Sequence, residues 1–166
     1  MISRTRLREL LDYNRVTGVF RWKYVKGEEA TKRLPGKIAG GPRSKHSYIQ
    51  LGLDGKRYYA HRVAWFYVYG TWPKYIDHRD RNKQNNALLN LREASVSQNG
   101  FNRRADRKNK LGVKGVRKDP KYEIYEARIC INGEQIALGW FRTVEQAKEA
   151  YKHAAQKFHG EFACWE

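Results

Sequence analysis

Residues 75 to 104 contain an acidic residue, a histidine and asparagines whose types suit hydrolytic chemistry. Asp77 and His78 are adjacent, at the end of a short apolar run. A hard divalent cation prefers oxygen ligands, which a carboxylate and the amide of a helix-borne asparagine supply. A neutral imidazole can take a proton from water near neutral pH. The combination predicts metal-assisted cleavage of a phosphodiester, although an adjacent Asp–His pair alone is more often a structural hydrogen-bonding pair.

The elements around this pair are expected to bring these side chains together. An amide-rich polar loop follows from Arg79 to Asn86, and Leu91 to Ala94 has the composition of a strand. Ser95 and Gln98 have the spacing of a capping box, which satisfies orphan amides at a helix start. The order strand, loop, strand, helix would place a carboxylate, an imidazole and amides near one point.

The spacing of these residues resembles the HNH endonuclease family, also called the ββα-metal or His-Me finger nucleases, and its phage and intron-encoded homing enzymes in particular. Asn90 and Asn99 lie 12 and 21 residues after His78. The loop departs from the family at Arg81, where a glycine is common. A lead-in found in such phage enzymes is also present, as His61-Arg62-Val63-Ala64-Trp65, Tyr69-Gly70 and Trp72-Pro73.

The resemblance implies a role for each matching residue. Asp77 and Asn99 would bind one divalent cation, expected to be Mg²⁺ with Mn²⁺ able to substitute. His78 would be the general base, and Asn90 would brace the loop and orient the histidine. His61 could approach the metal or a phosphate, although a histidine that begins an apolar helix is more often structural.

The composition points to a polyanionic partner. The 166 residues include 34 Lys and Arg against 17 Asp and Glu, which gives a net charge of +17. Such a surplus favours binding to nucleic acid through phosphate contacts, so double-stranded DNA is the expected partner. No apolar run approaches the roughly 20 residues of a membrane span, and the first residues lack the apolar core of a signal peptide. An intracellular, non-secreted protein without membrane association is therefore expected.

The two cysteines bear on metal binding and on redox state. Cys130 and Cys164 are too few for a tetrahedral zinc site or a disulfide framework. We therefore expect no structural zinc, and two reduced structural cysteines.

The residues before the Asp–His pair predict a helix followed by strands. Leu7, Leu10 and Leu11 have helical spacing within Ser3 to Tyr13, and Asp54-Gly55 between two strands is a hairpin signal. Basic and aromatic residues alternate in these strands, which suits contact with the DNA backbone and equally a solvated strand face. Residues 61 to 69 are expected to form a helix that ends at Gly70.

Residues 113 to 166 predict a second unit, with a three-stranded sheet and one helix. Asn132-Gly133 is a tight hairpin signal, and Thr143 with Gln146 forms a second capping-box pattern. The unit resembles the plant ethylene-response-factor (APETALA-type) DNA-binding domain, which lays its sheet in the major groove. The matching residues are Lys114 to Arg117, Ala127 to Ile129, Asn132-Gly133, Leu138 to Phe141, Ala147, Ala150-Tyr151, Ala154-Ala155 and His159-Gly160.

The alternation of the middle strand indicates which face would meet DNA. Tyr125, Ala127, Ile129 and Ile131 would face the helix, and Glu126, Arg128 and Cys130 would face outward. The candidate DNA-binding residues on that face are Lys114, Arg117, Arg128 and Gln135. Arginine commonly reads guanine, so Arg117 and Arg128 are the candidates for base contacts, with phosphate contact or simple solvation as the alternatives. Arg103, Arg104 and Arg107 are candidates for phosphate contacts.

These features predict an α+β protein with three parts. Residues 1–104 are expected to form a ββα-metal nuclease domain, with its core at 60–104 and an N-terminal elaboration made of a β-hairpin and a helix. Residues 105–112 are expected to form a basic linker. Residues 113–166 are expected to form a three-stranded antiparallel sheet packed on one helix. A chain cut near Lys110 would keep its whole metal site and should still cleave DNA, with weaker affinity and looser site choice.

The predicted function is site-specific, metal-dependent DNA cleavage of the homing type. The alternatives are a catalytically inert DNA-binding regulator on the same fold and an RNA-binding or ribosome-associated protein. A monomer is favoured and a dimer is possible, because one active site cuts one strand.

Overall fold

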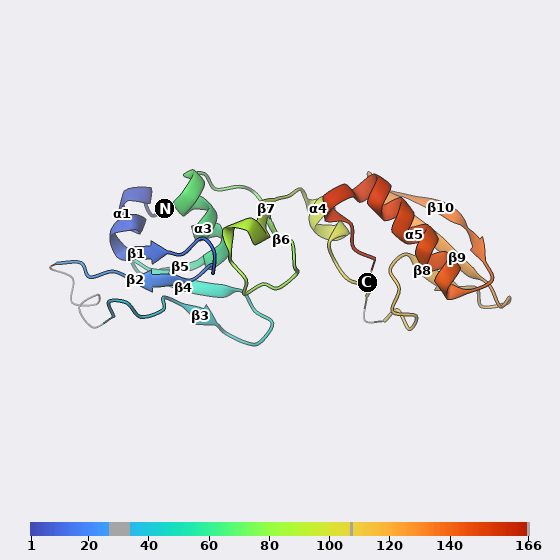
Figure 1. Ribbon diagram of the computed structural model, residues 1–166, viewed down its shortest axis with the longest axis horizontal. Helices are drawn as coiled ribbons and strands as arrows, with labels where there is room; N and C mark the ends of the chain where they lie inside the picture. Colours follow the sequence, from blue (N-terminus) through green and yellow to red (C-terminus); the bar gives the residue numbers. More distant parts are fainter. Residues whose placement is uncertain (27–33, 107, 166) are drawn as a thin grey trace. The chain divides into compact units, whose positions relative to one another are not determined.

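The structure is a computed structural model that describes residues 1–26, 34–106 and 108–165 (Figure 1). Contacts divide the chain into an N-terminal unit, Met1–Glu93, and a C-terminal unit, Ala94–Glu166. Both units combine helices with small antiparallel sheets, which confirms the α+β class. The division falls eleven residues before the predicted boundary at 104, so helix α4 makes its contacts within the C-terminal unit. The predicted domain limits stay a prediction.

The N-terminal unit begins with a shorter helix than the leucine spacing predicts. Helix α1 (Arg4–Leu10) starts at Ser3, whose hydroxyl accepts from the Arg6 amide at 3.1 Å. The chain then becomes strand β1 (Leu11–Tyr13), which pairs antiparallel with β2 (Phe20–Trp22). Burial alternates along β1, so pairing with β2 ends the helix at Leu10 and corrects the predicted extension to Tyr13.

The next sheet and helix follow the predicted turn signals. Strands β3 (Gly41–Pro42), β4 (Ile49–Leu53) and β5 (Lys56–Tyr59) form one antiparallel sheet. The hairpin turn at Asp54-Gly55 has both residues at positive φ, 45° and 74°, as a tight hairpin requires. Helix α3 (Ala60–Tyr69) continues from β5 and ends at Gly70 with φ 75°. Both predictions are confirmed.

A two-stranded ribbon completes this unit. Strand β6 (Ile76–His78) pairs with β7 (Leu91–Glu93), so that Asp77 lies opposite Arg92 and His78 opposite Leu91. A 3₁₀ turn, η1 (Leu88–Asn90), leads from the polar loop into β7. Ile76 and Leu91 belong to the same hydrophobic core as α1, β1 and α3, and this core therefore fixes the strand that carries Asp77 and His78.

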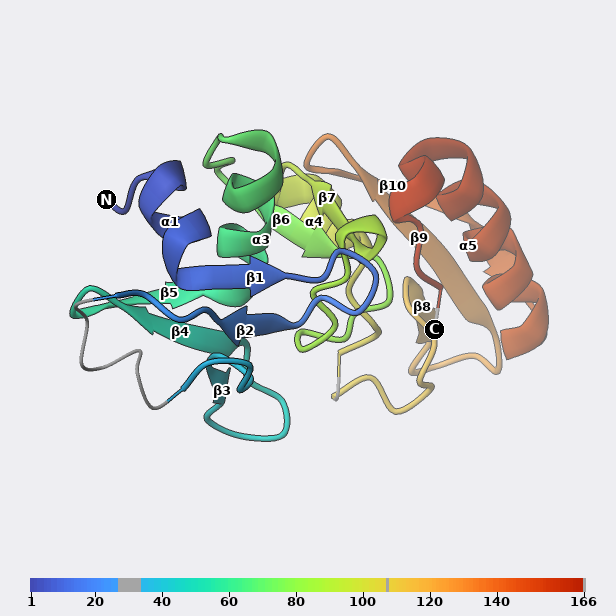
Figure 2. The same ribbon diagram turned by 60° about the vertical axis from the view of Figure 1, so that its left-hand side comes forward.

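The C-terminal unit consists of α4 (Val96–Phe101), a sheet of order β10-β9-β8, and a long helix. The strands are β8 (Val116–Lys118), β9 (Tyr125–Ile131) and β10 (Glu134–Phe141), and the helices after them are α5 (Val144–His159) and η2 (Gly160–Phe162). Figures 1 and 2 show α5 along one face of the sheet, where its buried alanines allow close packing. The Asn132-Gly133 turn again has two positive φ values, which confirms the hairpin.

Two details of this unit differ from the sequence prediction. The spacing of Phe158 from Ala147, Ala150, Tyr151 and Ala154 predicts that it belongs to an apolar stripe of α5, yet it is about half exposed, whereas His159 beside it is buried. Glu126 lies on the outer face with Arg117 and Arg128, but it is only 3% exposed because these two arginine side chains cover it. None of the helices in the described part of the chain combines the length and apolar character needed to cross a bilayer.

Candidate active site

His78 ends strand β6 in a buried position, and its contacts identify which ring nitrogen carries the proton. Its Nε2 lies 3.2 Å from Asn86 Oδ1. The amide nitrogen of Asn86 donates to the Gln84 carbonyl, which can only accept, so the amide oxygen must face the histidine. Nε2 therefore carries the proton in neutral His78, and Nδ1 carries the lone pair. That is the arrangement a general base needs.

Burial also favours the neutral form of this histidine. It lowers the pKa of His78 below its usual value, although the hydrogen bond to Asn86 and the carboxylates of Asp80 and Asp77 act in the opposite direction. A neutral imidazole near pH 7 can accept a proton, as a general base must.

Asn86 is itself held by the first strands of the chain. It is 1% exposed, and its backbone carbonyl accepts from the Tyr13 hydroxyl at 2.7 Å. Gly18 packs against the same backbone so closely that a Cβ there would lie 2.2 Å from Ala87 N. The turn between β1 and β2 therefore sets the position of the side chain that orients His78. The sequence analysis missed Asn86, because nothing in an amide-rich loop marks the one amide that is buried.

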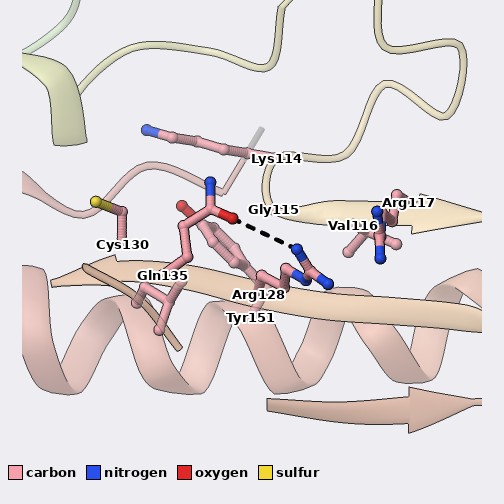
Figure 3. Close-up of a pocket in the computed structure, with 9 residues that line it drawn as sticks. Lys114, Gly115, Val116, Arg117, Arg128, Cys130, Gln135 and Tyr151 are labelled. Carbon is pink, nitrogen blue, oxygen red and sulfur yellow. Dashed lines mark hydrogen bonds between the residues drawn. The ribbon is translucent and has the colours of Figure 1, made fainter. Parts of the chain in front are cut away.

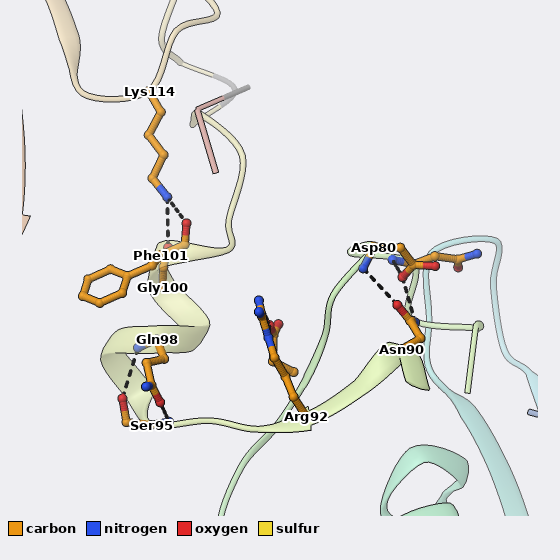
Figure 4. A network of polar contacts seen from close by, with 10 residues as sticks. Asp80, Asn90, Arg92, Ser95, Gln98, Gly100, Phe101 and Lys114 are labelled. Carbon is orange, nitrogen blue, oxygen red and sulfur yellow. Dashed lines mark hydrogen bonds and ion pairs between the residues drawn. The ribbon is translucent and has the colours of Figure 1, made fainter. Parts of the chain in front are cut away.

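Asn90 forms several hydrogen bonds within the polar loop that follows His78. Its Oδ1 accepts from the Asp80 amide at 3.0 Å, and its Nδ2 donates to Asp80 Oδ1 and to the Asn85 carbonyl at 2.9 and 2.7 Å (Figure 4). Its own carbonyl accepts from the amide of Arg79, the residue after His78. Arg81 has φ 63°, so the arginine adopts the left-handed conformation that glycine favours. Asn90 thus shapes the loop, while Asn86 supplies the side-chain contact to His78.

Asp77 forms a buried ion pair across the ribbon. Its Oδ2 accepts from Arg92 Nε at 2.8 Å and from Nη2 at 2.7 Å, and both residues are less than a tenth exposed. Charged, double hydrogen bonds of this kind fix a carboxylate in one orientation. The ion pair therefore presents Asp77 in a defined direction beside His78.

His61, at the start of α3, lies in an aromatic cluster with His78. The two imidazole centroids are 5.1 Å apart, and the Tyr48 ring lies 4.8 Å from that of His61. His61 Nδ1 is buried without a hydrogen-bond partner among the described residues. Burial, with smaller effects of His78 and Arg62, lowers the pKa of His61 to about 3, so the ring is neutral. The structure places the predicted auxiliary residue next to the candidate base.

Asn99 lies on α4, in the C-terminal unit. The capping box predicted for this helix is confirmed: Ser95 Oγ accepts from the Gln98 amide, and Gln98 Oε1 accepts from the Ser95 amide at 2.7 Å (Figure 4). Asn99 is half-buried in the middle of the helix. The second candidate ligand, Asp77, belongs to the N-terminal unit.

The donor set suits a hard cation better than zinc. Asp77 and Asn99 offer oxygen atoms, the ligands that Mg²⁺ and Mn²⁺ accept. Within the described residues, His, Cys, Asp and Glu do not gather in groups of three that could hold a metal. The Cys130 thiol is exposed and the Cys164 thiol is buried.

The candidate DNA-binding residues of the sheet share one acidic partner. Arg117 Nε lies 2.5 Å from one carboxylate oxygen of Glu126, and Arg128 Nε lies 2.7 Å from the other. Arg128 also approaches Gln135 at 3.5 Å, at the edge of a cavity of about 410 Å³ (Figure 3). The two arginines lower the pKa of Glu126, Arg128 having the larger effect. One carboxylate thus orients both guanidinium groups, a function that the sequence analysis did not assign to Glu126.

The other candidate DNA-binding residues differ in their contacts and exposure. The ammonium of Lys114 contacts the carboxyl end of α4 (Figure 4). Arg103 and Arg104 are exposed, and Arg107 lies outside the described residues.

Known proteins match the chain in the region of this site. A family described as HNH endonuclease matches residues 58–101, which span β5 to α4 and include His61, Asp77, His78, Asn90 and Asn99. An uncharacterized HNH endonuclease of Acanthamoeba polyphaga mimivirus, L560, is 38% identical over 90 residues, which are 54% of this chain and 46% of that protein. Protein 3.8 of Escherichia phage T7 is 31% identical over 121 residues, 72% of this chain and 97% of that protein.

The two viral proteins differ in how much of their length the chain matches. The chain matches less than half the length of the mimivirus protein and nearly all of the phage protein. No solved structure matches. The family match ends at Phe101, so the resemblance of residues 113–166 to ethylene-response-factor domains stays a prediction.

Proposed function

This chain belongs to the HNH endonuclease family, and on that basis we propose that it is a site-specific, metal-dependent DNA endonuclease of the homing type. One observation carries the proposal. His78 is buried and its Nε2 lies 3.2 Å from the amide oxygen of Asn86, which is a geometry that suits a neutral imidazole with its proton on Nε2 and with Nδ1 as the proton acceptor.

The residues of the N-terminal unit have distinct roles in this proposal. His78 removes a proton from the attacking water, which makes the oxygen a competent nucleophile for phosphorus. Asn86 keeps the imidazole in the required tautomer, and Asn90 holds the loop that follows it. Arg92 fixes the carboxylate of Asp77 for ligation.

Asp77 and Asn99 together would hold one divalent cation, Mg²⁺ or Mn²⁺. When bound, the cation stabilises the charge that develops on the phosphate and on the departing oxygen. The family match supports this pair, because it includes both residues.

The C-terminal sheet is proposed to bind duplex DNA. Its outer face presents Arg117, Arg128 and Gln135, and Glu126 restricts the two guanidinium groups to fixed directions. An arginine held in one orientation loses less freedom when it forms a bidentate contact with guanine. Arg103, Arg104 and Arg107 would add phosphate contacts. The net charge of +17 supports a polyanionic ligand.

Incubation of the purified chain with supercoiled plasmid, with Mg²⁺ or with EDTA, tests the proposal. Nicked product that requires Mg²⁺ is expected from a monomer, and linear product indicates a dimer or two binding events. Sequencing of the DNA ends should show cuts clustered at a preferred sequence. DNA that is bound but uncut would indicate an inert regulator, and preferential binding of RNA without cleavage would indicate an RNA-binding protein.

A further inference from the structure

The carboxyl end of α4 is held by a lysine from a distant part of the C-terminal unit. Lys114 Nζ donates to the carbonyls of Gly100 and Phe101 at 3.1 and 2.6 Å (Figure 4). It also donates to the Arg103 carbonyl at 2.8 Å. The last carbonyls of a helix have no partner within it, and a cation there also interacts favourably with the helix dipole. An ammonium group has three donors, and here all three have a carbonyl acceptor.

An aromatic contact holds the same end of the helix. The Phe101 ring stacks on the imidazole of His159, with centroids 3.7 Å apart and planes inclined by 7°. His159 is buried, and its Nε2 donates to the Cys130 carbonyl at 2.9 Å. A chain of direct contacts therefore runs from strand β9 through His159 and Phe101 to α4.

Helix α4 depends on such contacts for its position. It has only six residues. All six lie in the described part of the chain, and none of them is fully buried. Isolated helices shorter than about 12 residues are marginal in water, so most of the stability of a short helix comes from tertiary packing. Lys114 and His159 supply that packing at the end nearest Asn99.

We propose that Lys114 and His159 are positioning residues for the nuclease, because they hold the helix that presents Asn99 to the cation. The inference rests on the proposed function, in which Asn99 is a metal ligand. Residues 113–166 are then a structural part of the metal site as well as a DNA-binding sheet. A chain cut near Lys110 loses both contacts and is expected to lose cleavage, contrary to the expectation from sequence.

The test uses the whole 166-residue chain, two substitutions of Lys114 and one control. Lys114→Met removes the three donors but keeps the aliphatic stem, and Lys114→Arg restores donors at the same place. Lys110→Met is the matched control, since it removes one exposed charge from the same basic segment. Mn²⁺ affinity is measured by calorimetry and DNA affinity by fluorescence anisotropy in EDTA. Circular dichroism reports folding.

We expect Lys114→Met to weaken Mn²⁺ binding at least tenfold and Lys114→Arg to recover most of it. DNA affinity should change no more than in Lys110→Met. Unchanged Mn²⁺ binding in Lys114→Met would overturn the proposal, and a loss of DNA affinity alone would identify Lys114 as a DNA contact.

Two further variants keep the outcomes distinct. Phe101→Leu removes the flat stack on His159 while keeping an apolar side chain, and it should also weaken Mn²⁺ binding. It decides the matter if Lys114→Met fails to fold. Asn99→Ala tests the proposed function separately: if it leaves Mn²⁺ binding unchanged, the ligand set is wrong. If Asn99→Ala weakens binding but the Lys114 and Phe101 variants do not, only the positioning proposal fails.

Discussion

Removal of the Asn86 side chain should damage both stability and catalysis, because one amide holds the candidate base. In Asn86→Ala, the Nε2–H group of His78 loses its acceptor at a site where the histidine is 4% exposed. A buried donor without a partner costs about 1–3 kcal/mol. Water can reach the partly exposed Gln84, so the loss there should be smaller. We therefore expect the free energy of unfolding to fall by about 2 kcal/mol.

The effect on cleavage follows from the loss of orientation and of tautomer control. A hydrogen bond contributes about 0.5–1.5 kcal/mol net, and about 1.4 kcal/mol corresponds to a factor of ten in rate. A decrease of about tenfold or more is expected, limited by the whole contribution of a general base, about 100- to 10,000-fold. Single-turnover cleavage of plasmid at saturating Mg²⁺ measures the rate, and urea denaturation measures the stability.

Tyr13→Phe is the matched control for Asn86→Ala. It removes the hydrogen bond to the backbone carbonyl of Asn86 but leaves the amide–imidazole contact in place. It should lower stability by about 1 kcal/mol with little effect on the single-turnover rate. Equal rates in wild type and Asn86→Ala, or equal losses in both variants, would refute the assignment of Asn86 as the residue that orients His78.

Three further predictions concern the metal, the DNA and pH. Asp77→Asn should weaken Mn²⁺ binding in calorimetry, and unchanged binding would exclude Asp77 as a ligand. Asparagine is preferable to alanine because its amide oxygen can still accept a hydrogen bond from the buried Arg92. If Arg128 reads a base, Arg128→Ala should weaken DNA binding by about 1–3 kcal/mol at one base pair. If Arg128 instead contacts a phosphate, the substitution should lower the slope of log affinity against log salt by about 0.9 at every sequence. Competition binding at two salt concentrations separates these outcomes. The pKa of His61 is lowered to about 3 against an ordinary value near 6.5, so the unfolded chain binds the extra proton and stability falls as pH decreases below about 6.5. Urea denaturation measures how much the free energy of unfolding falls between pH 6.5 and 5. In His61→Phe this fall should be smaller than in wild type by about 2 kcal/mol, and an unchanged fall would contradict the burial of His61.

Local chemistry allowed much of the fold to be predicted. The turns at Asp54-Gly55 and Asn132-Gly133 and the end of α3 at Gly70 depend on residues that tolerate positive φ, and all three are confirmed. The capping box at Ser95 is also confirmed. It too is a local feature, because its hydrogen bonds join residues three positions apart. Features decided within four residues can be read directly from the chain.

Features that depend on distant partners could not be predicted in this way. Leu11 has helical spacing from Leu7, yet pairing with β2 draws it into a strand. Arg81 adopts a glycine-like conformation that its side chain alone would not suggest. Asn86 and Glu126 obtain their roles from Tyr13, His78 and two arginines, all of which the fold brings to them.

The candidate site shows the same division. The spacing of His78, Asn90 and Asn99 predicted the family from the sequence, and the family match at residues 58–101 spans all three. The contact between Lys114 and α4 could not be anticipated, since it joins a helix end to a residue beyond the linker. Side chains that hold the motif in place therefore needed the structure.

The most direct test of the central claim is the single-turnover rate of plasmid cleavage by His78→Ala compared with wild type at saturating Mg²⁺. A general base contributes about 100- to 10,000-fold to the rate, and it takes part in chemistry rather than in docking. We predict a loss of at least about 100-fold with DNA affinity unchanged within twofold. Retention of more than about a tenth of the wild-type rate would contradict the assignment of His78 as the general base of this nuclease.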